Sequence, residues 1–582
     1  MKKFLITTAD ENTWPNQKDN IIFLGEWCKK YSRKEIWSTY NSDTLSYHWF
    51  DTDKFDKDFK YLKSLQDRLL IKLSNCLNEL HGTNFSNKYW EVLIGEFIIL
   101  CTQVVYDRWE NIKNLPHKDI EFNTVRLLFT PSDIATNDLS ELQELSSNND
   151  SWNSIIYSII IDEFKKNNLL NINQINGEYR FLKSKYFYKS KNFKHLILYH
   201  YQKLVGYFFK KNQPLIIDSY LNYFDDISIN LNFNRLPLFV NIKKPIKVKE
   251  YIPSYRNWKI LFDSNNKFEE FLIRIIPLIM PKSYLEGYRD IVSKSNSSNF
   301  PQNPKFIFTS NISGDELLKN YIASKIEKDS KLIFGQHGGG YGSRNLFSEE
   351  SHETSISNRY LSWGWNDNKK NNILPFGIIK RSNLKRNLNA NNLTLVLNTN
   401  ARYSNFLSSH VISSQWLLYF NDQCSFINNL NLKINNKLFI KLYPSDYDWS
   451  QFDRFNSLSR SIKFYPKGLK FKKVLQKTRI CVSTHNATTF VESILCNIPT
   501  VIFWDTNISP IRDSSNKIFR DLETAGIFHR SPESAAKHVN KVWDNLDDWW
   551  NSKQVVNSIK NFKKYYCQPY PSNKDLTKAL SF

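Results

Sequence analysis

The sequence has few cysteines, and none of them is spaced to form a metal site. The seven cysteines contain no C-x-x-C pair, their number is odd, and Cys101 and Cys481 lie in apolar runs. These features disfavour a disulfide framework and a structural zinc site, and they favour a reducing compartment. We therefore expect a cytoplasmic protein.

Long hydrophobic runs are also missing. No run approaches the about 18 apolar residues of a transmembrane helix. The first apolar run, residues 4–8, is short and is followed by Asp10 and Glu11. We therefore expect neither a transmembrane helix nor a signal peptide, so that any contact with a membrane would be peripheral.

Acidic residues are outnumbered by basic ones, and the formal net charge is +22. Such a surface suits anionic lipid, phosphorylated ligands or nucleic acid. A Lys- and Asn-rich composition inherited from an AT-rich genome would give the same charge. The densest basic runs, residues 243–249 and 467–473, hold only four lysines each. Because no zinc-finger spacing occurs either, a nucleic-acid partner is disfavoured.

With 582 residues, 41% of them hydrophobic, the chain can form two or three domains with cores of their own. Short apolar segments alternate with helical patterns from residue 304 onward, which predicts parallel, doubly wound sheets. A polar stretch over residues 380–392 separates two such units. These units are preceded by two further short strands, 4–8 and 21–24, and by helical stretches over 56–110 and 151–164.

Glycine is scarce, yet five of the 16 glycines fall within residues 335–342. They follow a predicted buried strand, 331–334, and surround a single imidazole, that of His337. Glycine lets backbone N–H groups approach a ligand closely, so this is a candidate binding loop. A tight turn between two strands is the alternative.

A second polar loop joins a predicted strand, 480–483, to a helix that carries Glu492. Hydroxyl and backbone N–H groups at a helix N-terminus bind phosphate, and a glutamate on that helix can accept both hydroxyls of a ribose. An ordinary Thr-capped helix with a solvent-exposed glutamate is the alternative. Arg402, after the strand at 393–397, is another candidate for anion binding. The polar residues of the loop are Ser483, Thr484, His485, Asn486, Thr488 and Thr489.

Carboxylates follow several predicted strands of the N-terminal part. Ligands of open α/β sheets bind beyond the carboxyl ends of the strands, so these groups are candidates for a site. Helix caps and solvated loop positions are the alternative. Glu96, in an otherwise apolar helix over residues 89–108, is a lesser candidate. The four main candidates are Asp10, Glu11, Glu26 and Asp218.

The two loops and three further segments resemble a family of bacterial surface-polysaccharide (O-antigen) transferases with the GT-B fold. The three segments are Ser362-Trp363-Gly364-Trp365, Tyr443-Pro444-Ser445-Asp446-Tyr447 and residues 486–505. That family is distantly similar to transferases of Kdo, an ulosonic acid. The resemblance is clearest over residues 305–530. It indicates the fold and the broad class, but not the sugar.

The resemblance implies two Rossmann-like domains that face a cleft, with helical insertions in the first. Residues 1–380 would form the acceptor-side domain and residues 381–550 the nucleotide-sugar domain. Residues 551–582 would be a helical segment, with a return to the N-terminal domain as one option. The implied donor-binding residues are Gln336, Gly338, Gly339, Gly340, Asn400, Arg402, Tyr443, Ser483, His485, Asn486, Thr488, Thr489 and Glu492.

His337 would be catalytic, either as a neutral base or as a protonated group that stabilises the leaving phosphate. Asp10, Glu11, Glu26 or Asp218 would act as base or nucleophile, and the sequence does not choose among them. Asp-x-Asp patterns begin at Asp51, Asp56 and Asp446. Since the resemblance does not require them, we expect no obligatory metal, and no cofactor apart from the nucleotide-sugar substrate.

The expected function is transfer of a sugar, with Kdo from a CMP-linked donor as a candidate, to a growing O-antigen, capsule or lipopolysaccharide. The acceptor would be an anionic or lipid-linked glycan at the inner face of the cytoplasmic membrane. A teichoic-acid-type polyol-phosphate transferase is disfavoured because no long basic amphipathic segment occurs. A non-catalytic GT-B-like binding protein is disfavoured because both the His337 loop and the Glu492 helix are present.

Overall fold

The computed structural model describes residues 2–116, 121–166, 172–177, 193–208, 212–238, 248, 250–298, 300–380, 384–458 and 462–581. The basic run 243–249 lies outside the described residues except for Val248. Most of the polar stretch 167–192 and part of the stretch 380–392 lie outside them too. All seven cysteines are free, as their spacing predicts.

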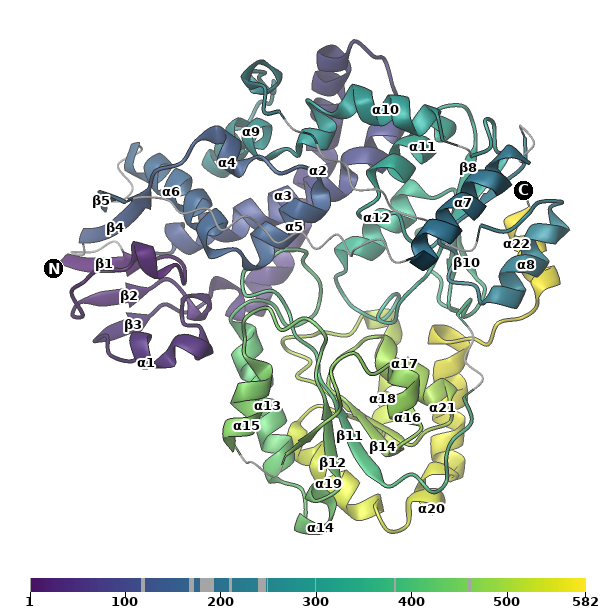
Figure 1. Ribbon diagram of the computed structural model, residues 1–582. Helices are drawn as coiled ribbons and strands as arrows, with labels where there is room; N and C mark the ends of the chain where they lie inside the picture. The colour runs from purple at the N-terminus through teal and green to yellow at the C-terminus, as the bar shows by residue number, and fades with distance from the viewer. Residues whose placement is uncertain are drawn as a thin grey trace.

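The chain before residue 380 builds two parallel sheets, where the sequence pattern suggested one domain. The first sheet has the order β3-β2-β1-β4-β5, so the strand order reverses between β1 and β4. In Figure 1 it lies at the left, beside the N-terminus. Its strands are β1 (Lys2–Ile6), β2 (Ile21–Phe23), β3 (Ser42–Thr44), β4 (Glu121–Leu127) and β5 (Ile172–Gly177).

The second sheet has the order β10-β9-β8-β7-β6 and contains the strand that leads into the glycine loop. Its neighbouring strands also pair in parallel. The core residues of β7 and β8 are almost fully buried, as expected for strands covered by helices on both faces. The strands are β6 (Leu215–Ile216), β7 (Phe306–Thr309), β8 (Lys331–Gly335), β9 (Arg359–Ser362) and β10 (Ile373–Pro375).

Helices fill the space between and around these two sheets. The pair α2 (Thr52–His81) and α3 (Asn87–Lys113) forms the centre of this layer, and α3 contacts α6, α9, α11 and α12. The remaining helices of this part are α1 (Lys34–Trp37), α4 (Pro131–Ile134), α5 (Leu139–Asn148), α6 (Asp150–Lys166), α7 (Phe193–Tyr207), α8 (Tyr223–Asn232), α9 (Lys267–Ile279), α10 (Tyr288–Asn296), α11 (Glu316–Ile326) and α12 (Ser348–Ile356).

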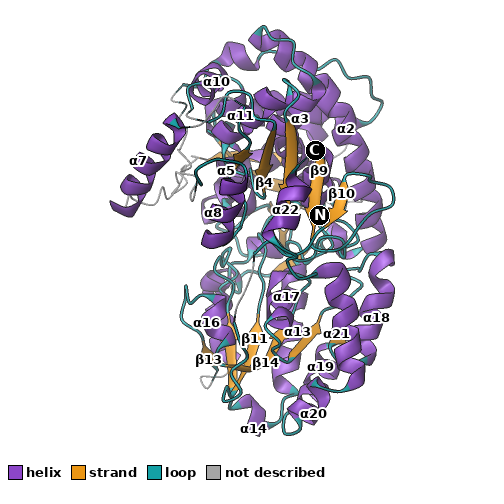
Figure 2. Ribbon diagram, turned by 90° about the vertical axis from the view of Figure 1, so that its right-hand side faces the viewer, coloured by secondary structure: helices purple, strands orange, loops and turns teal. Residues whose placement is uncertain are grey.

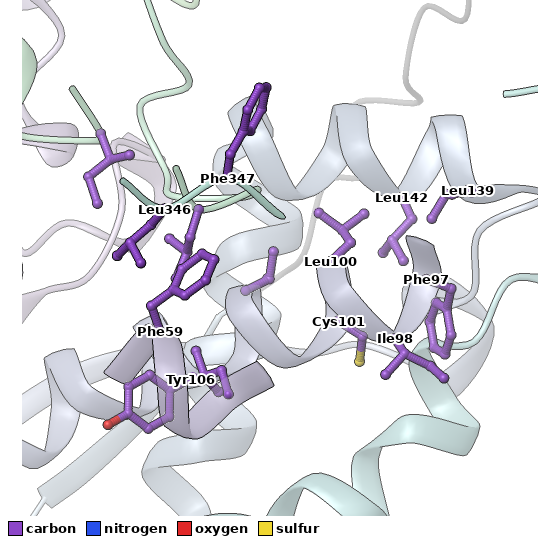
Figure 3. Close-up of a cluster of buried hydrophobic side chains, with 14 of the residues drawn as sticks. Phe59, Phe97, Ile98, Leu100, Cys101, Tyr106, Leu139, Leu142, Leu346 and Phe347 are labelled. Carbon is purple, nitrogen blue, oxygen red and sulfur yellow. The ribbon is translucent and has the colours of Figure 1, made fainter. Parts of the chain in front are cut away.

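Of the helices that the structure describes, α3 is the one long and apolar enough to cross a membrane. However, 89% of its most apolar stretch is buried inside the molecule. Leu100 lies among Leu142 of α5 and Leu346 and Phe347, which follow the glycine loop (Figure 3). The expectation from the sequence that no segment has the length and hydropathy of a membrane-spanning helix was therefore wrong. A helix that is apolar all round is also what a fully buried core helix requires.

The third sheet and its helices form the C-terminal domain, at the bottom of Figures 1 and 2. Its order is β13-β12-β11-β14-β15-β16, and all pairings are parallel. Counted from β11, this is the order 3-2-1-4-5-6 of a Rossmann fold, with its switch point between β11 and β14. The strands are β11 (Asn392–Val396), β12 (Leu438–Lys441), β13 (Lys463–Phe464), β14 (Thr478–Ser483), β15 (Thr500–Phe503) and β16 (Phe528–His529).

The helices of the C-terminal domain include α17, which begins directly after the polar loop of β14. The predicted α/β fold class with Rossmann-like parallel sheets is confirmed, extended here by one additional sheet. The helices are α13 (Gln415–Asn428), α14 (Leu432–Asn435), α15 (Gln451–Leu458), α16 (Phe471–Leu475), α17 (Thr488–Leu495), α18 (Asn516–Thr524), α19 (Pro532–Val542) and α20 (Leu546–Trp550).

The last two helices connect the two halves of the molecule. Helix α21 (Lys553–Tyr566) packs against α18, and α22 (Asn573–Leu580) packs against α8 beside the second sheet. Leu576 and Leu580 of α22 are buried with Ile216 of β6 and Phe306 of β7. The chain therefore ends on the N-terminal half, as Figure 2 shows.

Candidate active site

The glycine loop is anchored by Gln336 at its first position. The Gln336 side-chain nitrogen donates to Gly338 O at 2.7 Å. Its side-chain oxygen accepts from the backbone N–H of Trp363 and the indole N–H of Trp365, both at 2.8 Å. Because these contacts use both ends of the amide, the geometry does not support the predicted donor-binding role of Gln336. The Ser-Trp-Gly-Trp motif thus holds the loop in place.

The glycines of this loop lie directly on the first turn of α17. Gly339 N–H donates to the hydroxyl of Thr488 at 2.9 Å. A Cβ at Gly339 would lie 2.6 Å from the carbonyl carbon of Ala487, and Gly340 has φ +89°. Arg344 adds a hydrogen bond of 2.7 Å to Asn486 O. Glycine is therefore required here for a close approach between two domains, in addition to any approach to a ligand.

His337 faces a cavity of about 200 Å³ in the N-terminal half. Its Nδ1 lies 3.6 Å from a carboxylate oxygen of Glu353. Its ring stacks on Tyr220, with 5.9 Å between centroids. Burial lowers the pKa of His337 to about 4, so the imidazole is neutral near pH 7. This favours the role of a neutral base over that of a cation.

Two glutamates of α12, Glu349 and Glu353, line the same cavity. Spaced four residues apart, they lie on one face of the helix. Glu353 accepts hydrogen bonds from Tyr341 OH at 3.0 Å and Tyr360 OH at 3.2 Å. Burial and the neighbouring Glu349 raise the pKa of Glu353 well above its ordinary value, and burial also raises the pKa of Glu349.

Our sequence reasoning missed both glutamates of α12. The available signal was a Glu-x-x-x-Glu spacing in a helix that begins shortly after a glycine-rich loop. Glu96 of α3, the lesser candidate, does line this cavity, and its carboxylate contacts Lys319 at 2.5 Å.

A second, smaller cavity of about 20 Å³ lies at the β11/β14 switch point of the C-terminal sheet. His485 is only 8% exposed, and its buried Nδ1 has no hydrogen-bond partner among the described residues. His410 Nε2 lies 2.6 Å from the side-chain nitrogen of Asn398. The lining also includes Tyr419, Asp422, Trp504 and Asp505.

The electrostatics of this smaller cavity are asymmetric. Burial, His410 and Arg344 together lower the pKa of His485 to about 3, and burial and Arg344 lower that of His410 to about 3. On the other side, burial and the nearby Asp505 raise the pKa of Asp422 to about 6. The cavity therefore has one side with two imidazoles that are neutral near pH 7 and lie close to Arg344, and an opposite side with two carboxyl groups that could accept hydrogen bonds from hydroxyls.

The first turn of α17 borders this cavity through Asn486. Its N-cap residue is Ala487, which supplies no side-chain hydrogen bond to the helix. The hydroxyl of Thr488 already accepts a hydrogen bond from Gly339 N–H, and the hydroxyls of Ser483 and Thr489 lie 3.3 Å apart. Glu492 points elsewhere, because it pairs with Lys380 at 3.3 Å and does not line the cavity. This placement does not support its predicted contact with a ribose.

Three further predicted donor residues have mainly structural contacts. Arg402 is 1% exposed and pairs with Asp150 of α6 at 2.9 Å, so its charge is already neutralised by a carboxylate. Asn400 O accepts from the indole N–H of Trp449 at 2.8 Å. Tyr443 is 39% exposed and lines neither cavity.

The N-terminal carboxylates are divided between two places. Asp10 accepts from the hydroxyl of Ser151 at 2.8 Å, and Glu11 pairs with Arg33 at 2.6 Å. Both line a cleft of about 630 Å³ at the first sheet, which shares no lining residue with the His337 cavity. Glu26 pairs with Lys29 at 2.9 Å. These three are thus not brought together with His337, because they belong to a different sheet.

Asp218 is the one of these carboxylates that lies near His337. It lines a cleft of about 480 Å³ together with Tyr220, the residue that stacks on the imidazole. Asn311 lines both this cleft and the His337 cavity. The two spaces are therefore neighbours on the second sheet.

The Asp-x-Asp patterns are used in local structure. Asp51 caps α2, and Asp58 accepts from the indole of Trp49 at 2.9 Å. Asp446 accepts from Ser450 N–H at 2.8 Å, and Asp448 pairs with Lys30 at 3.1 Å. Within the described ranges, no group of three or more His, Cys, Asp or Glu side chains is arranged to hold a metal ion.

Comparison with solved structures gives partial likenesses. A protein assigned as a UDP-N-acetylglucosamine 2-epimerase from Listeria monocytogenes is 10% identical, with 49% of this chain and 74% of that chain covered and a TM-score of 0.30. WaaG, a glycosyltransferase involved in lipopolysaccharide biosynthesis, is 10% identical, with 51% and 95% covered and a TM-score of 0.26. Likenesses this weak carry no argument about activity.

None of the curated proteins matches this chain at a significant level. The model of one protein family does match, and it does so over residues 3–580, which is nearly the whole chain. The protein therefore belongs to the LIC12162 family of transferases.

Proposed function

We propose that the protein is a glycosyltransferase that moves a sugar from a nucleotide-activated donor to a glycan. The observation that carries this proposal is the group of histidines and carboxyls at the β11/β14 switch point, which would contact part of a bound donor. Ligands of Rossmann-type sheets bind at that place. A donor phosphate beside Arg344 would favour protonation of His410 and His485, and the carboxyls on the other side suit ribose hydroxyls.

The first turn of α17 also favours binding of the donor phosphates at this place. A helix N-terminus without a capping side chain leaves backbone N–H groups that favour an anion. Ala487 is a poor N-cap, since an Ala in place of Ser, Thr, Asp or Asn costs about 0.5–2 kcal/mol. An anion at this end would offset that cost. It would also stabilise the protonated forms of His410 and His485.

The N-terminal half would supply the acceptor side of the reaction. His337 and the α12 glutamates line a cavity that lies next to the glycine loop, and this loop contacts α17. Transfer requires a group that removes a proton from the attacking hydroxyl and a group that stabilises the leaving phosphate. The two cavities offer these groups on opposite sides of one inter-domain contact.

Kdo or another ulosonic acid from a CMP-linked donor is the first sugar to test, because the resemblance extends distantly to Kdo transferases. The acceptor would be a growing surface glycan, such as O-antigen, capsule or lipopolysaccharide. We expect metal-independent transfer, in which helix N-termini and basic side chains offset the phosphate charge.

A peripheral position at the inner face of the cytoplasmic membrane is part of this proposal. Tyr207 and Phe208, at the end of α7, are 70% and 65% exposed, and Tyr223 and Phe224 of α8 are 58% and 79% exposed. Both helices lie on the same side of the molecule in Figures 1 and 2. Exposed aromatic side chains on a chain of net charge +22 suit the surface of an anionic bilayer.

Nucleotide binding by the full chain tests the proposal directly. We would measure melting temperatures with CMP, UDP and GDP, and then sugar transfer from their Kdo, N-acetylglucosamine and mannose conjugates by mass spectrometry. A nucleotide at about 100 times its dissociation constant should add about 2.7 kcal/mol of stability. His485→Asn should remove most of this gain.

Glu492→Ala is the matched control, because Glu492 lies on α17 but outside the cavity. It should keep the nucleotide effect. Loss of the effect in this variant would place the ribose on α17, as the sequence pattern suggests. If the wild-type protein bound no nucleotide, the glycosyltransferase proposal would be wrong. A non-catalytic binding role would then remain.

A further inference from the structure

The cavity beside His337 contains polar groups that the protein itself does not satisfy. Glu349, in the first turn of α12, is exposed, and no described residue forms a hydrogen bond or an ion pair with it. His352 is 5% exposed, and its buried Nε2 has no hydrogen-bond partner among the described residues. A buried polar group in a protein is normally paired, so the unpaired Nε2 of His352 points to a ligand, and Glu349 lines the same cavity.

The surroundings keep His352 in position. A Cβ on Gly95 of α3 would lie 2.5 Å from His352 Cε1, so the glycine makes room for the ring. This explains the glycine inside an otherwise apolar helix. Glu353, one turn after Glu349, is by contrast held by the hydroxyls of Tyr341 and Tyr360. The cavity thus has a fixed wall, one buried nitrogen without a partner among the described residues, and one carboxylate that is free to contact a ligand.

We propose that this cavity binds one ring of the acceptor as an uncharged sugar or an amino sugar, and that Glu349 accepts the proton of the attacking hydroxyl. This inference rests on the proposed glycosyltransferase function. The cavity of about 200 Å³ is much larger than the about 10–15 Å³ that a single water needs, so it has room for a larger ligand. Hydroxyls of a sugar would donate to Glu349 and to the neutral nitrogen of His352.

The charge of the cavity excludes an acidic ring at this position. Glu96, Glu349 and Glu353 all line it, Lys319 contacts Glu96, and Arg344 is close enough to Glu349 to act against the rise of its pKa. A uronic acid or a phosphate would meet like charges in a confined space. The anionic acceptor expected from the net charge of the chain would therefore need its negative groups outside this cavity.

The two α12 carboxyls have different roles in this proposal. Burial and Glu349 raise the pKa of Glu353 well above its ordinary value, and the hydroxyls of Tyr341 and Tyr360 hold its two oxygens. Glu349 has no such contacts and lines the cavity, so it is the carboxyl placed to accept a proton from a sugar. When the environments of two neighbouring carboxyls push their pKa values apart, one can act as the base and the other as a neutral hydrogen-bond partner.

In the proposed transfer step one bond forms, one bond breaks and one proton moves. The acceptor oxygen forms a bond to the anomeric carbon of the donor sugar, and the bond from that carbon to the phosphate oxygen breaks. The electron pair of the broken bond leaves with the nucleotide. The proton of the acceptor hydroxyl passes to Glu349 and then to solvent.

Sugar binding by the full chain tests the proposal without knowledge of the natural acceptor. Saturation-transfer NMR would compare methyl glucoside, N-acetylglucosamine and galactosamine with glucuronate. Ser313 is an exposed residue of the lining, so the variant Ser313→Trp would block the cavity with a large side chain at little cost to the core. Glu349→Gln keeps the shape, and Glu270→Gln, at an exposed position of α9, is the matched control.

We expect the neutral or amino sugars to bind to the wild type and to Glu270→Gln, and glucuronate not to bind. Ser313→Trp should abolish this binding, and nucleotide stabilisation should remain in every variant.

Glu349→Gln should lower transfer about 10²–10⁴-fold and remove the acidic limb of the pH–rate profile. Equal binding of glucuronate, insensitivity to Ser313→Trp, or no sugar binding at all would overturn the proposal. A protein that bound sugars but no nucleotide would instead contradict the glycosyltransferase function.

Discussion

The backbone N–H of Gly339 donates a 2.9 Å hydrogen bond to the hydroxyl of Thr488, and the two residues belong to different halves of the molecule. His337 lies two residues before Gly339, and His485 lies three residues before Thr488. This single contact therefore joins the loops that line the two candidate cavities.

Gly339→Ala should destabilise the inter-domain contact, while Gly338→Ala should be tolerated. A Cβ at Gly339 would lie 2.6–2.8 Å from backbone atoms of Ala487 and Thr488, whereas a Cβ at Gly338 would lie 3.4 Å from the nearest atom. Overpacking against backbone costs about 1–3 kcal/mol. Chemical denaturation of both variants measures the difference. Equal stability of the two variants would show that the domains can separate at no cost.

His337→Ala should abolish most transfer while leaving the fold and nucleotide binding nearly intact. With Glu349 as the group that accepts the proton, the neutral imidazole of His337 would orient the attacking hydroxyl, and misplacement of a reacting group costs about 10²-fold in rate. Because burial lowers the pKa of His337 to about 4, no titration of this residue should appear in the rate between pH 5 and 8. Tyr220→Phe, which keeps the stacked ring, is the control. Near-normal turnover of His337→Ala would make the loop a structural turn.

Nucleotide binding should tighten as the pH falls from 7 to 5. His410 and His485 have pKa values of about 3 in the folded protein, and a phosphate beside them would raise these values, so binding takes up protons. Calorimetry in buffers of different ionisation enthalpy measures this uptake. Proton release on binding would place the phosphates elsewhere.

The same two histidines predict acid sensitivity of the free protein. In the unfolded chain each has an ordinary pKa of about 6.5. The unfolded state therefore binds more protons than the native state between about pH 6.5 and pH 3, and stability falls as the pH drops through that window. His485→Asn should lessen the fall, as denaturation curves at pH 7 and pH 5 would show. An unchanged slope in the variant would mean that His485 is protonated in the folded state.

Arg402→Ala should destabilise the protein strongly without changing nucleotide affinity. The guanidinium is almost fully buried, and its loss would leave Asp150 as a buried charge with a weakened network. Breaking a buried pair in this way costs about 3–5 kcal/mol. Arg33→Ala, which breaks an exposed pair with Glu11, should have little effect. Loss of nucleotide binding in a folded Arg402→Ala protein would restore the anion-binding role predicted from the sequence.

The exposed aromatic residues of α8 should contribute to vesicle binding. Tyr223→Ser combined with Phe224→Ser should weaken association with vesicles of anionic phospholipid at least tenfold, since burial of one large apolar side chain is worth about 1.5–3 kcal/mol. Binding of the wild type should also weaken as the ionic strength rises above about 0.1 M. Salt-independent binding, or no effect of the two serines, would count against a peripheral membrane position.

Local patterns in the sequence were sufficient for the elements of the fold and for the broad class. Alternating apolar strands and amphipathic helices determined the parallel sheets, because a strand buried on both faces must be a continuous apolar run. Five glycines within eight residues marked a backbone that must approach something closely. The sequence could not say what that neighbour is, and it turned out to include the first turn of α17.

Only the tertiary structure decided which polar residues belong together. Asp10 and His337 follow strands of similar pattern, yet they lie on different sheets, because helices α2 and α3 separate the two. Arg402 is matched with Asp150, 252 residues away in the chain, and so is removed from the anion-binding candidates. Glu349 was not a candidate from the sequence, and only the fold brought it into one cavity with His337 and with Glu96 of α3. Burial and charge pairing are properties of the space around a side chain, and distant segments create that space.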